Sequence, residues 1–177
     1  DGMAFVGVYL SANGTQLQML TQAGIQATGT TLTVGRWCHI ALVRSGTTAT
    51  VYLDGVQDMQ IASVPTISPH VYLFGGNGIG VLNGRVQDAG VWTAALSQAD
   101  VQAEMASVGV AARSANLWAY YPLVNSAHDA GVAARHLTPS GVTWEGNQVL
   151  GAASATTITR GVAAGAVLKS GAAQAQG

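Results

Sequence analysis

The residues with catalytic potential in this sequence are few and widely spaced. Glycoside hydrolysis needs two carboxylates on one site, because one protonates the leaving oxygen while the other attacks or activates water. The chain has only two glutamates, Glu104 and Glu145, and no expected strand carries acidic residues at positions i and i+2. The sequence therefore offers no carboxylate pair of this type, and we expect no glycosidase activity.

Zinc-dependent and nucleophilic chemistry is equally poorly supported. The histidines are scattered and form no His-x-x-x-His pair, which would place two imidazoles on one helix face. They are His39, His70, His128 and His136. No Gly-x-Ser-x-Gly elbow is present to expose a serine nucleophile. The single cysteine, Cys38, lies in an apolar run typical of a core strand. These absences predict a protein that is not an enzyme.

Composition excludes several classes of partner. The net charge is −1 and no basic stripe is present, so we expect no nucleic acid partner. The longest apolar stretches are far shorter than the roughly 20 residues that cross a bilayer, so we expect no membrane insertion. Charged residues make up only 8% of the chain, against roughly 25% in an ordinary soluble domain. A surface with so little self-repulsion fits a subunit of an assembly, or a monomer with a neutral surface rich in Ser, Thr, Asn and Gln.

Short strands separated by turns account for most of the chain. Residues 15–21 alternate apolar and polar side chains with the period of two that is typical of a half-buried strand. Residues 37–44 and 48–53 are two further strands, and Asp54-Gly55 predicts a hairpin because both central positions of that turn need positive φ. The other expected strands are 3–10, 30–34, 70–74, 84–92, 117–123 and 138–144. This spacing favours an antiparallel sandwich or barrel.

One helix interrupts the series of strands. Ser97 and Asp100 form a Ser-x-x-acid cap, and apolar residues beyond it share one face. The pattern predicts a helix over 98–107, with its apolar face formed by Val101, Met105 and Val108.

Three motifs, in order, resemble laminin G-like domains of the concanavalin A-like lectin/glucanase superfamily. The runs WCHIALVR at 37–44 and TVYLDG at 50–55 are similar to that family's central hairpin. The run GRVQDAGVW at 84–92, followed by ALS at 95–97, is similar to its closing strand and short helix. The resemblance implies an all-β fold, a jelly-roll sandwich of two antiparallel sheets with one short helix.

A fourth motif is out of the family's usual order. The run LWAYYPL at 117–123, with Asp129 after it, resembles the segment that usually opens such a domain. It either fills the opening strand's place in the same sandwich or begins a second, truncated domain. We favour the first, because an unfilled sheet edge would leave backbone groups unpaired.

The expected domain organisation follows from these motifs. Residues 1–150 form the sandwich, with 117–144 supplying the permuted opening strand. Residues 151–177 are rich in Ala and Gly and have few large side chains, so we expect a flexible tail or a docking arm that orders against a partner. The sequence begins at Asp1 rather than at Met, and we expect that an upstream segment was cleaved or left out.

The resemblance also implies a place for a structural calcium ion. Members of the superfamily often hold one between an aspartate near the opening strand and another in the closing strand, and the matching residues are Asp129 and Asp88. Hard cations need several oxygen ligands, with carboxylates among them. Here Gln87 stands where the first acidic residue belongs, and Asp88 is expected to point to the opposite face of the strand. Calcium is therefore a weak candidate, and no other cofactor is expected.

Two functions remain for the non-enzymatic sandwich. The first is a structural or adhesion module of a surface assembly, on a virion or an extracellular surface. Its likeness to laminin G-like proteins of bacteria and phages points to a capsid decoration, tail or fibre component, with protein subunits, including copies of itself, as partners. The second is a carbohydrate-binding module of a bacterial extracellular protein, in which aromatic side chains stack on sugar rings beside fixed amides. The candidates for such glycan contacts are Asn77, Trp118, Tyr120 and Trp144.

Overall fold

The computed structural model describes residues 5–12, 14–64, 85–131 and 134–138, and the backbone of 158–159 and 166–168. Its elements in chain order are β1 (Val6–Leu10), β2 (Gln16–Thr21), β3 (Gly24–Thr31), β4 (Ile40–Ser45), β5 (Thr48–Leu53), β6 (Val56–Ile61), β7 (Ala89–Trp92), α1 (Gln98–Ala106), β8 (Leu117–Tyr121), β9 (Ile158–Thr159) and β10 (Ala166–Leu168).

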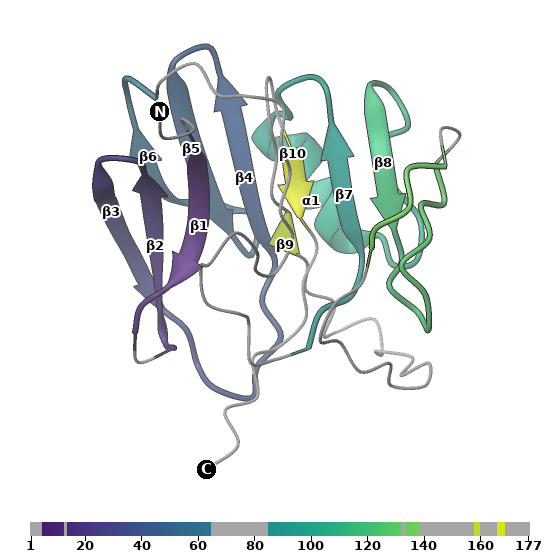
Figure 1. Ribbon diagram of the computed structural model, residues 1–177, viewed down its shortest axis with the longest axis horizontal. Helices are drawn as coiled ribbons and strands as arrows, with labels where there is room; N and C mark the ends of the chain where they lie inside the picture. The colour runs from purple at the N-terminus through teal and green to yellow at the C-terminus, as the bar shows by residue number, and fades with distance from the viewer. Residues whose placement is uncertain are drawn as a thin grey trace.

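The described strands form two sheets. One has three strands in the order β1-β2-β3, and the other has seven in the order β6-β5-β4-β9-β10-β7-β8. Neighbouring strands are antiparallel, except that β9 runs parallel to β4. Figure 1 shows the small sheet lying over the β4–β6 half of the large sheet, with α1 on the opposite face. The predicted all-β sandwich of antiparallel sheets with one short helix is confirmed.

The large sheet is buried on both faces along β4. Ile40 and Leu42 belong to the apolar core between the two sheets, whereas Ala41 and Val43 pack with Trp92 on the side of the helix. Successive side chains of a strand point to opposite faces, so one strand contributes to both cores. Consecutive apolar residues in β4 follow from this double burial.

The Asp54-Gly55 turn forms as predicted. Both residues have positive φ, 49° and 76°, and the flanking residues of β5 and β6 pair directly, Leu53 with Val56. Asp54 also receives the backbone N–H of His39 on its Oδ1 at 2.8 Å and donates its own N–H to the His39 carbonyl at 2.7 Å. The turn is thereby tied to the segment that leads into β4.

The capped helix also forms as predicted. The Ser97 hydroxyl accepts the Asp100 N–H at 3.1 Å, and the Asp100 carboxylate accepts the Ser97 N–H at 2.8 Å, which is a reciprocal capping box. The side-chain amides of Gln98 and Gln102 donate to the Gly55 carbonyl at 3.0 and 3.1 Å. The helix therefore holds the tip of the β5–β6 hairpin.

Several predicted boundaries were wrong. A strand was expected at 30–34, but the strand in this region is β3, at Gly24–Thr31. Most side chains of β3 are exposed, so apolar and polar residues do not alternate along it. The strand expected from residue 37 begins at Ile40, and the strand expected from residue 84 begins at Ala89. Asp88 interrupts the latter because its φ is 56°, in the left-handed region. Val108 lies beyond the end of α1 and is exposed, so it does not share the buried helix face.

The segment at 117–121 pairs within the large sheet. Here β8 lies beside β7, with Ala89 opposite Tyr121 and Val91 opposite Ala119. Of residues 151–177, for which we expect a tail or docking arm, the structure describes the backbone of β9 and β10, which lie between β4 and β7. The strand expected at 70–74 lies outside the described residues, and so does the strand expected at 138–144 apart from Thr138. Among the described residues, no helix is long and apolar enough to cross a membrane.

Candidate functional site

The acidic side chains of the described chain share one structural role. Each of them accepts a hydrogen bond from a backbone N–H, so each carboxylate holds a strand, turn or loop in place. They are Asp54, Asp58, Asp88, Asp100, Glu104 and Asp129. Hydrogen bonds from N–H groups to carboxylates are stronger than neutral ones. In a chain with eight acidic residues in all, this role takes up most of the carboxylates.

Asp88 and Tyr120 form a buried pair between the large sheet and α1. The Tyr120 hydroxyl donates to Oδ1 of Asp88 at 2.6 Å, and the same oxygen accepts the Gly109 N–H at 3.1 Å. Burial raises the pKa of Tyr120 well above its usual value, and the negative charges of Asp88 and Glu104 raise it further. Tyr120 therefore acts as a permanent hydrogen-bond donor that satisfies a buried carboxylate.

Glu104 is a structural residue that the sequence analysis did not identify. It faces inward from α1 with 0% of its surface exposed. Its carboxylate accepts the Arg113 N–H at 2.6 Å and the Ala112 N–H at 3.1 Å, while the Trp92 indole donates to the Arg113 carbonyl at 2.8 Å. These contacts fix the chain between α1 and β8. No short motif signals them, because the partners lie eight and nine residues beyond Glu104.

Asp129 holds the loop that follows β8 against the outer edge of that strand. Its Oδ1 accepts the N–H groups of Tyr120 and Gly131, and its Oδ2 accepts that of Arg135, each at 2.8 Å. The Ala130 N–H donates to the Tyr120 carbonyl at 2.6 Å. The outward-facing backbone groups of Tyr120 are thus paired, which protects the edge of the sheet from joining another strand.

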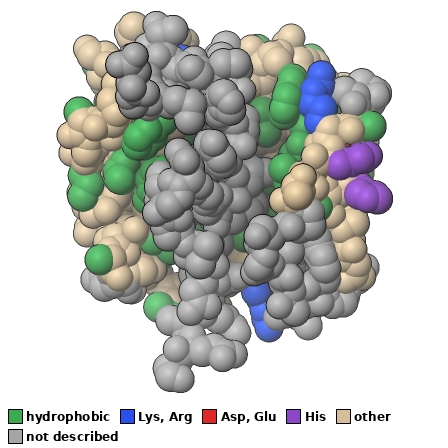
Figure 2. Space-filling view, viewed as in Figure 1, with side chains coloured by type: hydrophobic (Ala, Val, Ile, Leu, Met, Phe, Trp, Pro, Cys, Tyr) green, Lys and Arg blue, Asp and Glu red, His purple; other side chains and the backbone are tan. Residues whose placement is uncertain are grey.

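Trp118 lies at the same end of the large sheet, with Arg135 against its ring. The Arg135 guanidinium lies 4.6 Å from the centre of the Trp118 ring and donates to the Trp118 carbonyl at 2.7 Å, a cation–π geometry. The rings of His128 and His136 are 4.6 Å apart, and Nδ1 of His136 accepts the Asp129 N–H at 3.1 Å. Exposed histidine side chains lie side by side on the surface in Figure 2.

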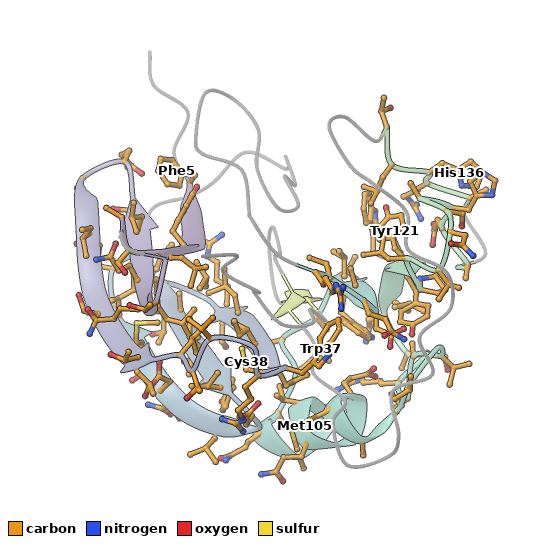
Figure 3. All side chains as sticks on the ribbon, turned by 90° about the horizontal axis from the view of Figure 1, so that it is seen from below. Phe5, Trp37, Cys38, Met105, Tyr121 and His136 are labelled. Atoms are coloured by element: carbon orange, nitrogen blue, oxygen red, sulfur yellow. The ribbon has the colours of Figure 1, made fainter. Side chains whose placement is uncertain are left out.

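The structure describes two of the four candidate glycan-binding residues, Trp118 and Tyr120. Tyr120 is only 3% exposed, so its ring does not reach the surface where a sugar could stack on it. Trp118 is half-buried, with Arg135 against its ring. Asn77 and Trp144 lie outside the described residues. Figure 3 shows Tyr121 and His136 at one end of the sandwich, far from Phe5 at the other.

Asp88 and Asp129 do not fit a calcium site. Calcium takes about six to eight oxygen ligands, whereas the carboxylates of Asp88 and Asp129 are directed at N–H and O–H donors. The two residues meet Tyr120 through different groups, its hydroxyl and its backbone N–H. Within the described part of the chain, no cluster of three His, Cys, Asp or Glu residues could hold a metal ion.

The Cys38 thiol and the His39 ring are core groups. Both are buried, and burial, with a smaller contribution from the nearby Asp54 charge, raises the pKa of Cys38 from 9.0 to about 12. A thiol that stays protonated at neutral pH is a poor nucleophile. The placement of both residues agrees with the structural role that the sequence indicated.

Comparison with known proteins gives one match. A family model, Laminin_G_3, described as the concanavalin A-like lectin/glucanases superfamily, matches residues 1–102. No curated protein and no solved structure is significantly similar to the chain. The match covers more than half of the 177 residues and includes the strands from β1 to β7, the Asp54-Gly55 hairpin and the capped start of α1. The chain therefore belongs to the concanavalin A-like lectin/glucanases superfamily.

Proposed function

We propose that this chain is a non-catalytic binding module, and that it serves as a structural or adhesion subunit of a surface assembly, such as the capsid decoration, tail or fibre of a phage virion. The observation that carries the non-catalytic part is the role of the carboxylates. Each described acidic side chain accepts a backbone N–H. A general acid or base must instead reach the reacting group of a substrate.

The surface supports the assembly part of the proposal. Only 8% of the residues are charged, and several large apolar side chains are exposed on strands and loops. These are Ile25, Val34, Val56, Val108 and Val110. A neutral surface with exposed apolar groups gains from contact with a neighbouring subunit.

The molecular mass of the full chain in solution tests this proposal. We expect light scattering to give a mass above that of one chain, rising with protein concentration. We also expect no release of reducing sugar from a panel of polysaccharides. A monomer across the whole concentration range would contradict the assembly role, and sugar release that persists in independently purified batches would contradict the non-catalytic role.

A second function, carbohydrate binding, is favoured by the partly exposed Trp118 ring beside Arg135. Aromatic rings at a surface rim are common platforms for sugars. A glycan array with the full chain tests it, with Trp118→Ala as the variant and Trp37→Ala, also a half-buried tryptophan, as the matched control. Binding that Trp118→Ala alone abolishes would support this function, whereas no binding to any glycan would contradict it.

A further inference from the structure

The loop after β8 covers the outer edge of the large sheet. We call its described part, residues 122–131 and 134–137, the β8 cover. Strand β8 is the last strand of that sheet. The Tyr120 N–H donates to the Asp129 carboxylate, and the Tyr120 carbonyl accepts the Ala130 N–H. The β8 cover therefore occupies backbone groups with which another strand would otherwise pair.

His136 takes part in closing the β8 cover as a hydrogen-bond acceptor. Its Nδ1 accepts the Asp129 N–H at 3.1 Å. This bond fixes the backbone of the residue whose carboxylate accepts three further N–H groups along β8 and the cover. An imidazole nitrogen accepts a hydrogen bond only while it carries no proton. The closed arrangement therefore needs the neutral form of His136, with its proton on Nε2.

A second imidazole lies against the first. The rings of His128 and His136 have their centres 4.6 Å apart and are tilted by 38°, and both residues are exposed. Histidine side chains gain a proton as the pH falls from neutral into mild acid. Two positive charges at this separation repel each other. Acid therefore removes the acceptor on His136 and adds a repulsion beside it.

The charges around the pair come from one aspartate and one arginine. Apart from the two histidines, the described residues of β8 and its cover include four ionisable ones: Tyr120, Tyr121, Asp129 and Arg135. Burial raises the pKa of both tyrosines, so they stay neutral in acid. Arg135 adds positive charge. The Asp129 carboxylate attracts a protonated ring, but a proton on Nδ1 of His136 would meet the Asp129 N–H, so the ring has to leave its position.

The backbone of the β8 cover is strained. Leu123, Asn125 and Ala134 have left-handed φ values of 56°, 53° and 49°. Residues other than glycine adopt this region at a cost in free energy, and they stay there only where surrounding contacts outweigh that cost. A loop held closed against strain opens more readily when one of its contacts is lost.

We propose that the β8 cover is a pH-sensitive device, closed at neutral pH and released in mild acid by protonation of His136 and His128. The open form takes up a proton that the closed form excludes from Nδ1, so the closed form is favoured at neutral pH and disfavoured as the pH falls. Release exposes the N–H and carbonyl of Tyr120 at the edge of β8. The inference goes beyond the proposed function, since it concerns the control of this edge and holds for a monomer or an assembly.

Amide hydrogen exchange of the full chain at pH 7 and pH 5 tests the proposal. The quantity compared is the protection factor, which relates each exchange rate to that of an unstructured chain at the same pH. We expect the protection factor of the Tyr120 amide to fall about tenfold or more at pH 5, and that of Leu42 in the central strand β4 to stay constant. His136→Asn keeps a side-chain oxygen that can accept the Asp129 N–H but has no group that titrates here, so its Tyr120 amide should be equally protected at both pH values.

Three outcomes would overturn the inference. One is a Tyr120 protection factor that does not change with pH. Another is an equal fall at Tyr120 and Leu42, which indicates global unfolding. The third is an undiminished fall in His136→Asn, because another group then senses the pH. If His136→Asn unfolds by circular dichroism, His128→Asn replaces it: loss of the repulsion should reduce the fall at Tyr120 at least about twofold, and an unchanged fall would again overturn the inference.

Discussion

The Tyr120 hydroxyl and the Asp88 carboxylate are joined by a 2.6 Å hydrogen bond in the buried space between the large sheet and α1. Asp88 lies within the range that the superfamily model matches, and Tyr120 lies outside it. The bond therefore connects the part of the sandwich that the family model matches to β8, which follows the helix in the chain. A left-handed φ of 56° at Asp88 turns the backbone just before β7, at the residue whose carboxylate meets the tyrosine.

Removal of the Tyr120 hydroxyl tests the importance of this connection. We expect Tyr120→Phe to lower the free energy of unfolding by about 1–3 kcal/mol, because the buried Asp88 carboxylate loses the tyrosine hydroxyl as a donor. Urea denaturation measures the change. Tyr52→Phe is the control, since Tyr52 is partly buried against the apolar cluster on the helix side of the sheet. Equal losses in the two variants would show that the Asp88 bond contributes nothing specific.

Alkaline pH should destabilise the fold. Burial raises the pKa of Cys38 to about 12 and that of Tyr121 to about 12, and the pKa of Tyr120 is also raised. In the unfolded chain these groups ionise near 9.0 for the thiol and 10.0 for the phenols. The folded state therefore holds protons that the unfolded state releases, and stability is full below pH 9 and falls as the pH rises toward 12.

The slope of the free energy of unfolding against pH gives a measurable contribution for Cys38. Each such group lowers the free energy of unfolding by up to about 1.4 kcal/mol per pH unit within its window. We expect Cys38→Ala to flatten the fall between pH 9 and 10, where the thiol acts before the phenols. Urea midpoints measured at successive pH values check this. An unchanged slope in Cys38→Ala would mean that the thiol ionises equally in both states.

The Asp129 loop should control hydrogen exchange at the edge of β8. Asp129→Ala removes the acceptor of three backbone N–H groups, those of Tyr120, Gly131 and Arg135. Hydrogen bonds to a charged acceptor contribute about 1.5–3 kcal/mol, so we expect the Tyr120 amide to exchange about ten- to a hundredfold faster. The Leu42 amide in the central strand β4 serves as an internal control. Equal acceleration at both amides would indicate global destabilisation instead of local opening.

Calcium should have no effect on this fold. The carboxylates of Asp88 and Asp129 accept hydrogen bonds from protein donors. A ligand that binds only the folded state raises the free energy of unfolding, and it does so more when it binds more tightly. We expect the melting temperature to be the same with millimolar calcium and with a chelator. A rise of several degrees in calcium that Asp129→Asn abolishes would contradict this assignment.

Local signals in the sequence predicted the elements that depend on local chemistry. Asp54-Gly55 and Ser97-x-x-Asp100 specify a turn and a helix start through backbone conformation and neighbouring hydrogen bonds, and both formed where expected. The alternation of residues 15–21 predicted β2, at Gln16–Thr21, because one face of this strand is buried at Leu17 and Met19.

Contacts between distant segments could not be predicted in this way. Most residues of β3 are exposed, so burial leaves no periodic pattern in its sequence. The burial of Glu104 depends on where residues 112 and 113 pass beside α1. Asp88 was expected on a strand, but its left-handed backbone and its bond to Tyr120 are tertiary features. The calcium assignment was based on motif position and the sugar-stacking role of Tyr120 on its aromatic side chain, whereas burial and hydrogen bonding determine the roles of these side chains.

The contact between Gly29 and Asp58 offers a direct test of the link between the two sheets. A Cβ at residue 29 would collide with the Asp58 carboxylate and lie 2.9 Å from side-chain atoms of Met59. We expect Gly29→Ala to lower the free energy of unfolding by about 1–3 kcal/mol, as overpacking does. Asp58→Ala in the same chain should recover part of that loss, since it removes the group that the new methyl displaces, and Met59 accounts for the remainder.

A double-mutant cycle by urea denaturation measures the recovery. We expect a coupling free energy of about 1 kcal/mol between positions 29 and 58, which is typical of residues in contact. The matched cycle pairs Gly29→Ala with Gln60→Ala, because Gln60 is an exposed residue of β6 two positions beyond Asp58. That cycle should be additive. If the Gly29–Asp58 cycle is additive as well, the Asp58 carboxylate does not bridge β3 and β6 in solution.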